Sequence, residues 1–337
     1  MKNLFDPVNI AGLALKNRLV MAPMTRCRAS GGVPTAEIAE HYRKRAAGGI
    51  GLIITEGVLV DHPEARADYG EVPYLREDTV EGWRQVVDAI HAEGSMVFPQ
   101  IWHCGPVVRP GVAGRSVVDE QGNEVVRLAT AKDKEELFHA YSHAAEMAPR
   151  CGFDGVELHG AHGYLLDSFM RAGDMGFATE IIRETRLKIG PDMPLCLRFS
   201  NWRADDMKDT YFNSPAELEQ LLKQVIEAGV DVLHPSTRRF WAHPFKDESL
   251  TLAGWTRKLT GLPTIIVGNI GLKTAGLVGS GPGSLESLER LLNHDEFDLA
   301  AVGRPLITEP DWGRKVEERQ FDQITDFYEA AIKEVYP

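Results

Sequence analysis

The chain has 337 residues, of which 43% are hydrophobic and 26% are charged, a composition typical of soluble globular proteins. Its formal net charge of −12 argues against a surface for nucleic acid or anionic membranes, although local arginines bind phosphate even in an acidic protein. The four cysteines show no CxxC spacing, which argues against a zinc ribbon, an iron–sulfur cluster or a disulfide scaffold. The sequence contains no signal peptide and no apolar run of membrane length, so a cytoplasmic protein is expected.

From Leu19 onward, short apolar runs alternate with amphipathic segments of helical length. The runs are almost continuously apolar, as strands covered by helices should be. They predict eight strands, at 19–24, 51–57, 95–103, 155–160, 194–200, 231–237, 264–271 and 299–305.

The segments between these runs carry helix signals. Ser214 is an N-cap candidate with Pro215 and Glu217 behind it, and Gly229 is expected to end that helix. The alternation of strands and helices, without a linker, predicts one domain over residues 1–337, an α/β fold of the (β/α)8 TIM-barrel type. A doubly wound open sheet is less favoured, because the turn after the first strand lacks a GxGxxG sequence.

The segment from Cys104 to Thr130 is too long for an ordinary barrel loop and is rich in Gly, Pro and Val. It follows the third predicted strand. We expect it to form a small excursion over the barrel mouth, with a hairpin between Asp119 and Asn123.

Polar side chains follow the predicted strands at their C-terminal ends, where the catalytic residues of TIM barrels gather. Amides, hydroxyls, imidazoles and guanidinium groups dominate there, whereas a metal-dependent hydrolase or isomerase needs several carboxylates. Such donors suit a planar, anionic cofactor rich in oxygen and nitrogen. The positions are Pro23, Met24, Thr25, Glu56, Gly57, Gln100, His103, His159, His162, Tyr164, Arg198, Gly268, Asn269, Gly303 and Arg304.

Arginine and glycine give the clearest signals among these positions. The segments VGNIG and VGRP place glycines and polar residues where the last two strands of a TIM barrel bind phosphate. Arg198 lies inside an apolar run and needs a carboxylate or an electron-rich ligand to offset its desolvation. Gln100 is expected to contact the same ligand, while Thr25 is equally compatible with a strand-filling role.

The segment FDGVELHGAHGYLLDSF, at 153–169, brings His159, His162 and Tyr164 within six residues. Two imidazoles and a phenol offer two N–H donors and a proton source to one small molecule. A packed pair of core histidines is an alternative. A metal site completed by His103 is another, disfavoured by the lack of nearby carboxylates.

Four segments together resemble the Old Yellow Enzyme family of FMN-dependent oxidoreductases. They are LFDPVNIAGLALKNRLVMAPMTRCRA, QIWHCG, GFDGVELHGAHGYLLDSF and VGRPLITEPDW, and they occur in order from Leu4 to about Arg314. The resemblance implies an enzyme, an NAD(P)H ene-reductase, whose barrel holds FMN non-covalently. It would take hydride from NADPH or NADH and reduce small electrophilic alkenes conjugated to a carbonyl or nitro group. A monomer or homodimer is expected.

The resemblance also assigns roles to individual residues. His159 and His162 would bind the substrate oxygen and stabilise the developing enolate, and Tyr164 would donate the proton. Pro23, Met24, Thr25 and Gly57 would line the isoalloxazine, Gln100 and Arg198 would bond its pyrimidine edge, and Gly268, Asn269, Gly303 and Arg304 would hold the phosphate.

The sequence departs from the family pattern at three places. The segment after the fourth strand lacks a stretch similar to RTDEYGGSxxNR, Pro106 replaces a common arginine, and Asn269 replaces a small residue. These changes keep two alternatives open: a flavin-dependent reductase with another acceptor (a quinone, nitro compound or flavin), and a catalytically impaired FMN-binding protein. An iron–sulfur dienoyl-CoA reductase is not expected, because the cysteines are scattered and the chain ends soon after the barrel.

Overall fold

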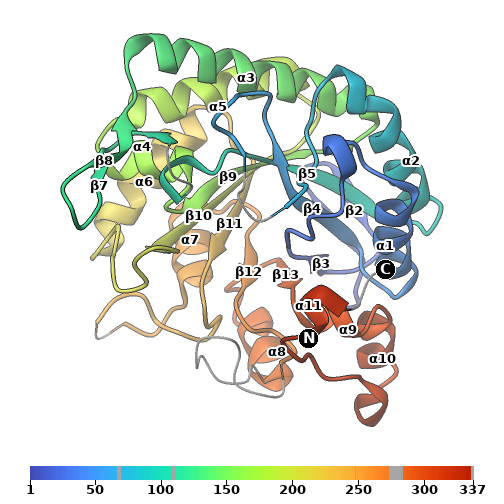
Figure 1. Cartoon of the computed structure of the whole chain (residues 1–337). Coiled ribbons are helices and arrows are strands. Elements are labelled where there is room, and N and C mark those ends of the chain that lie inside the picture. The colour runs from blue at the N-terminus through green and yellow to red at the C-terminus, as the bar shows by residue number, and fades with distance from the viewer. Residues whose placement is uncertain (67–69, 108–110, 247, 273–283, 335–337) are drawn as a thin grey trace.

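A closed barrel of eight parallel strands forms the centre of the computed structural model, which describes residues 1–66, 70–107, 111–246, 248–272 and 284–334 (Figure 1). Around the barrel the strands follow the order β10-β11-β12-β13-β3-β4-β5-β9, so the predicted TIM barrel is confirmed. In chain order the strands are β3 (Leu19–Met21), β4 (Leu52–Leu59), β5 (Met96–Trp102), β9 (Val156–His162), β10 (Leu195–Arg203), β11 (Val232–Ser236), β12 (Ile265–Val267) and β13 (Leu299–Val302).

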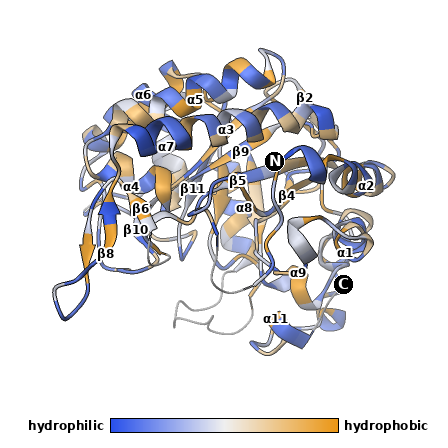
Figure 2. Cartoon of the chain, turned by 45° about the horizontal axis from the view of Figure 1, so that its top comes forward, coloured by the Kyte–Doolittle hydropathy of each residue, from blue (hydrophilic) through white to orange (hydrophobic). Residues whose placement is uncertain are grey.

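Helices surround the barrel on its outside (Figure 1). They are α1 (Ala36–Ala47), α2 (Val80–His91), α3 (Ala131–Cys151), α4 (Leu165–Arg171), α5 (Met175–Ile189), α6 (Pro215–Glu227), α7 (Leu252–Thr260), α8 (Leu285–Asn293), α9 (Pro305–Thr308), α10 (Trp312–Glu317) and α11 (Ala331–Glu334). Hydrophilic and hydrophobic residues alternate along them in Figure 2, as they do in helices with one face on a core. None of the helices in the described ranges is long and apolar enough to cross a membrane.

Helix α6 illustrates how the sequence sets these elements. The Ser214 hydroxyl accepts the N–H of Glu217, and Pro215 opens the helix, as predicted. The Glu217 carboxylate accepts the N–H of Asn213, one residue earlier than in a standard capping box. Gly229 follows the helix with a φ of +115°, a conformation that glycine adopts readily.

Two hydrophobic cores hold the barrel together. The larger core lies between the strands and the surrounding helices. The smaller one fills the barrel interior, where Val20, Leu52 and Leu299 pack together near the starts of their strands. A hairpin of β1 (Val8–Ile10) and β2 (Leu13–Leu15) adds buried apolar side chains to this interior core.

The interior becomes polar on one side of the barrel, toward the strand ends. Neighbouring inward positions are set by the strand register, in which Arg198 of β10 lies between His159 of β9 and His234 of β11. Successive strand residues face opposite sides, so Glu157 and Cys196 occupy the inward layer below. On this side, the barrel core therefore consists of ionisable groups.

The predicted excursion between β5 and α3 is confirmed. It contains β6 (Gly111–Ala113), β7 (Val117–Val118) and β8 (Glu124–Leu128), in the sheet order β6-β8-β7. Asp119 and Asn123 close the hairpin between β7 and β8, with the Asp119 N–H donating to the Asn123 carbonyl at 2.9 Å. The Gly114 N–H donates to the Ser168 hydroxyl of α4, so the excursion lies at the rim of the mouth beside α4.

Candidate active site

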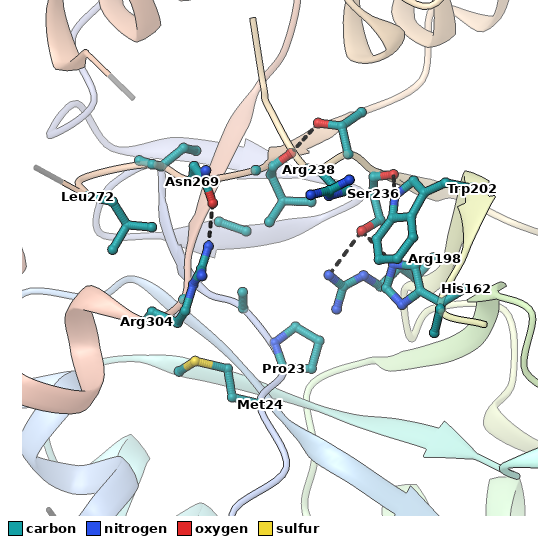
Figure 3. Close-up of a pocket in the computed structure, with 18 of the residues that line it drawn as sticks. Pro23, Met24, His162, Arg198, Trp202, Ser236, Arg238, Asn269, Leu272 and Arg304 are labelled. Atoms are coloured by element: carbon teal, nitrogen blue, oxygen red, sulfur yellow. Dashed lines mark hydrogen bonds between the residues drawn. The ribbon is translucent and has the colours of Figure 1, made fainter. Parts of the chain in front are cut away.

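Two adjoining cavities open at the C-terminal ends of the strands, with volumes of about 460 and 150 Å³. Pro23, His162 and Arg198 line both of them. The larger cavity is also lined by Met24, Gly268, Asn269, Gly303 and Arg304 (Figure 3). The smaller cavity is also lined by Thr25, Gln100, His159 and Tyr164. The fold thus brings together all of the residues to which the resemblance assigns a role, except one.

The exception is Gly57, which lines neither cavity. A Cβ atom at Gly57 would lie 2.3 Å from the Trp102 ring, so glycine is needed here to make room for that indole. Trp102 in turn packs edge-on against Tyr164, with 5.0 Å between ring centroids, and lines the smaller cavity. Gly57 therefore acts on the site through the position of Trp102.

Arg304 forms a cationic end of the larger cavity, close to the C-terminal ends of β12 and β13. Arg304 donates to the side-chain oxygen of Asn269, and no carboxylate in the described ranges forms an ion pair with this guanidinium. Gly268 has a φ of +141°, and a Cβ atom there would come within 2.7 Å of the Thr237 carbonyl oxygen. A partly buried cation beside closely packed glycine backbone suits an anionic group such as a phosphate.

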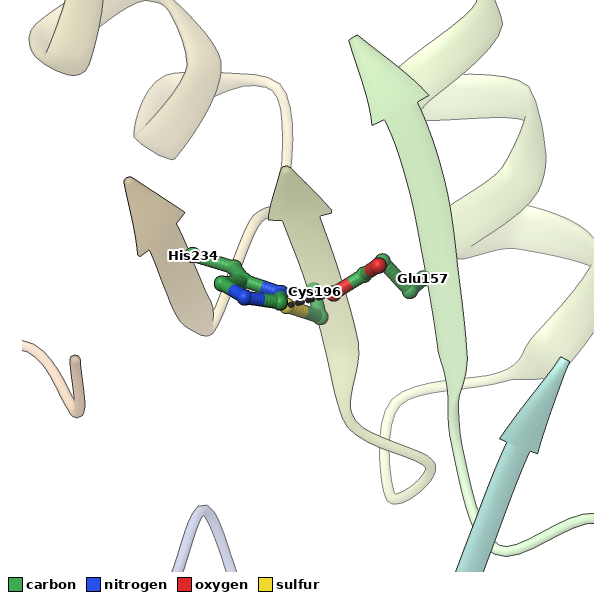
Figure 4. Close-up of side chains that lie close together, drawn as sticks. All are labelled: Glu157, Cys196 and His234. Carbon is green, nitrogen blue, oxygen red and sulfur yellow. Dashed lines mark hydrogen bonds and ion pairs between the residues drawn. The ribbon is translucent and has the colours of Figure 1, made fainter. Parts of the chain in front are cut away.

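A buried cluster of ionisable side chains supports the opposite end of the cavity (Figure 4). Glu157 accepts hydrogen bonds from His234 Nδ1 at 2.6 Å, from the Gln100 amide at 2.7 Å and from the Cys196 thiol at 3.3 Å. Burial alone would raise the pKa of Glu157, but His234, Arg198 and Gln100 hold it at about 2. Burial lowers the pKa of His234, so a neutral imidazole donates to an ionised carboxylate.

The described residues can also be compared with the alternative prediction of a metal site formed by His103, His159 and His162. Glu157, Cys196 and His234 are the one group of three potential metal ligands among the described residues. Their polar atoms are hydrogen-bonded directly to one another, and Glu157 accepts from both His234 and Cys196. His103 faces His62 instead, with 3.2 Å between their ring nitrogens, and does not join His159 and His162.

The chain turns sharply after His162, and this turn aims the histidines and Tyr164. His162 has a φ of +64°, and its N–H donates to the Ser200 hydroxyl at 2.8 Å. The next N–H, of Gly163, donates to the Asp167 carboxylate at 2.6 Å. These two bonds fix the turn from the neighbouring strand and from helix α4.

His159 is a neutral hydrogen-bond donor in this arrangement. Burial and the charge of Arg198 lower its pKa to about 3. Its Nδ1 accepts the Ala161 N–H at 3.3 Å, so the ring proton resides on Nε2. Tyr164 lies edge-on to His159 with 4.7 Å between ring centroids. A donor N–H and a phenol hydroxyl therefore border the smaller cavity together.

Several residues of the site were not predicted from the sequence. Glu157 sits in the run VEL and His234 in the run VLH, where a charged or polar residue inside a buried strand is the same signal that marked Arg198. The larger cavity is also lined by Trp202 and Ser236, for which the sequence carries no comparable signal.

Comparison with known proteins gives the family. Residues 3–323 match the model of the NADH:flavin oxidoreductase / NADH oxidase family. The chain belongs to the Old Yellow Enzyme family. The family is one of oxidoreductases, and its description names NADH and flavin.

Individual relatives agree with this membership. The chain is 32% identical to an NADH oxidase of Thermoanaerobacter brockii, over 96% of this chain and 52% of that protein. It is 35% identical to 12-oxophytodienoate reductase 7 of Oryza sativa subsp. japonica, over 67% of this chain and 64% of that one. The chain thus spans about half the length of the first relative and less than two thirds of the second.

Solved structures share the fold. The Old Yellow Enzyme homologue NCR from Zymomonas mobilis is 25% identical and superposes with a TM-score of 0.80, over 98% of this chain and 96% of that one. Morphinone reductase in complex with tetrahydroNAD is 23% identical, with a TM-score of 0.81 over 98% and 94% of the two chains. These likenesses extend to almost the whole barrel.

Removing the carboxylate of Glu157 should destabilise the barrel. Glu157→Ala leaves the charge of Arg198 buried without the nearby carboxylate and removes the acceptor for His234 and Gln100. Loss of one member of a buried charge pair costs about 3–5 kcal/mol. Glu157→Gln keeps a carbonyl acceptor and should cost less. Urea unfolding measures both variants, with Glu136→Ala on the exposed face of α3 as the control, expected within about 0.5 kcal/mol of wild type. A wild-type midpoint for Glu157→Ala would contradict this prediction.

Proposed function

We propose that the chain is an FMN-dependent ene-reductase, which uses NADPH or NADH to reduce an alkene conjugated to a carbonyl or nitro group. The observation that carries the proposal is the constellation of His159, His162 and Tyr164 beside a cavity with a cation at each end. Relatives named 12-oxophytodienoate reductase and cinnamate reductase support an alkene substrate. We further propose that residues 1–337 act as one FMN-binding barrel. Its cytoplasmic location and its state as a monomer or homodimer stay predictions.

The donor set of the larger cavity fits FMN. Arg198 has a buried Nε with no hydrogen-bond partner, so a donor is left for an electron-rich ring edge. The Gln100 amide nitrogen already donates to Glu157, which turns the amide oxygen away from the carboxylate, where it can accept the N–H of a pyrimidine edge. Arg304, next to Gly303, Gly268 and Asn269, would hold the phosphate, and Pro23, Met24 and Thr25 would line the ring.

When bound, FMN supplies the hydride chemistry, from NAD(P)H to the β-carbon of the alkene. The chain's own residues bind and polarise the substrate. His159, as a neutral Nε2–H donor, and His162 would hold the carbonyl or nitro oxygen and stabilise the charge that develops on it. Tyr164, which packs against His159, would donate a proton from its hydroxyl to the α-carbon.

The proposal is tested by the visible spectrum of the purified protein and by its redox chemistry without oxygen. We expect a yellow protein whose flavin absorbance is bleached by NADPH or NADH and restored by 2-cyclohexenone. Restoration by a quinone but not by the enone would identify another acceptor. A protein that stays colourless after incubation with FMN would overturn the proposal.

Tyr164→Phe should separate the two half-reactions. The substitution removes the hydroxyl that would donate the proton and leaves Arg198 and Arg304 unchanged. The rate at which NADPH bleaches the flavin should therefore equal that of the wild type. Reoxidation by 2-cyclohexenone should slow by about 100-fold, within the range that general acids contribute. Stopped-flow spectroscopy measures both steps, with Tyr328→Phe at an exposed position as the control. A Tyr164→Phe variant with slow bleaching and normal reoxidation would argue against the assigned role.

His159→Ala should weaken the binding of phenols, whose oxygen resembles that of an enolate. One lost hydrogen bond to a charged oxygen should raise the dissociation constant about tenfold or more. Because the pKa of His159 is near 3, the ring should stay neutral and its contribution should not change between pH 5 and 8. Titration of the flavin spectrum measures the affinity, with His139→Ala on exposed α3 as the control. Phenol affinity equal to that of wild type would remove His159 from this role.

A further inference from the structure

The hydroxyl of Ser236 lies between Arg198 and His162. Ser236 is the last residue of β11 and is buried. Its Oγ is 3.2 Å from Arg198 Nη2 and 2.8 Å from His162 Nε2 (Figure 3). One hydroxyl therefore connects a residue at the proposed cofactor edge with a residue at the proposed substrate oxygen.

The groups involved fix the direction of the bond from Arg198 and allow Ser236 to donate to His162. A guanidinium has only donors, so Ser236 Oγ accepts from Arg198. The serine still has its own proton to donate, and His162 Nε2 lies within reach as an acceptor, at 2.8 Å. His162 is neutral, since burial and the charge of Arg198 lower its pKa. An Nε2 that accepts leaves the single ring proton on Nδ1.

Trp202 holds the same imidazole from its face. The indole and the His162 ring are stacked, with 4.4 Å between centroids and 29° between planes. The indole N–H donates to the Ser236 carbonyl oxygen at 3.2 Å, so Ser236 anchors the stacking partner as well. The orientation of the His162 ring therefore depends on Ser236 through both its hydroxyl and its backbone.

We propose that Ser236 is a positioning residue, which fixes His162 as the Nδ1–H tautomer and ties its orientation to Arg198. His159 carries its proton on Nε2, so the two histidines present N–H groups from different ring nitrogens. The Nε2–H of His159 and the Nδ1–H of His162 can both donate to one oxygen only if neither ring changes its tautomer. The identity of the ligand that carries this oxygen rests on the proposed function, whereas the tautomer of His162 does not.

The first experiment is ¹⁵N NMR of the holoprotein labelled at histidine, which reports the protonated ring nitrogen directly. His162 is identified by the signal that is lost in His162→Asn. We expect Nδ1–H in the wild type and a shift toward Nε2–H in Ser236→Ala, because the donor to Nε2 is gone. Ser236→Thr keeps a hydroxyl and should restore Nδ1–H. The matched control is Ser142→Ala, which removes a hydroxyl on α3 that donates to Glu184 of α5, and it should leave His162 unchanged.

The second experiment measures phenol affinity in the same variants. Ser236→Ala should raise the dissociation constant about tenfold, which corresponds to about 1.4 kcal/mol, and Ser236→Thr should recover most of it. An Nδ1–H signal that persists in Ser236→Ala, or an Nε2–H signal in the wild type, would overturn the assignment. If the wild type instead shows Nδ1–H but binds no phenol, the proposed function fails and the role of Ser236 in the tautomer stands.

Discussion

The burial of Arg198 inside the barrel is the constraint on which the site depends. A guanidinium removed from water requires compensation, and Glu157 supplies it from the neighbouring strand with a carboxylate held ionised by its surroundings. That carboxylate in turn needs donors, which His234, Gln100 and Cys196 provide. Arg198 keeps one buried nitrogen without a partner. His234 Nε2 is likewise buried without a partner, so the network retains unsatisfied polar atoms next to residues that line the cavity.

This polar network occupies only one side of the barrel interior. Strands β9, β10 and β11 contribute the ionisable groups, while the inward residues of β3, β12 and β13 are apolar and belong to the interior hydrophobic core. The apolar side and the β1–β2 hairpin provide rigid packing, so the polar side can carry unsatisfied donors. The ionisable groups of this network lie on the strands that also hold His159 and Ser236, which keeps the donors of the site on rigid elements.

The sequence predicted the elements well and the contacts between elements poorly. Apolar runs located all eight strands, because a barrel strand is buried on both faces whatever its partners are. The ends were less accurate. Strand β4 continues to Leu59, where it pairs with Trp102, and β10 continues through polar residues to Arg203, which pairs with His162. Glu157 is detectable by the argument that found Arg198. Ser236 and Trp202 are not, because their importance arises from the register of β10 and β11 and from a stacking contact across it.

Two site residues other than glycine adopt left-handed backbone conformations, His162 with a φ of +64° and Asn269 with a φ of +57°. Asparagine tolerates this region better than most residues, which explains why Asn269 can replace the small residue that is common in the family. In each case hydrogen bonds compensate the strain: Ser200 accepts the His162 N–H, and Arg304 donates to the Asn269 side chain. The strain therefore serves a purpose, since these two conformations place an imidazole and an amide in the lining of the cavity.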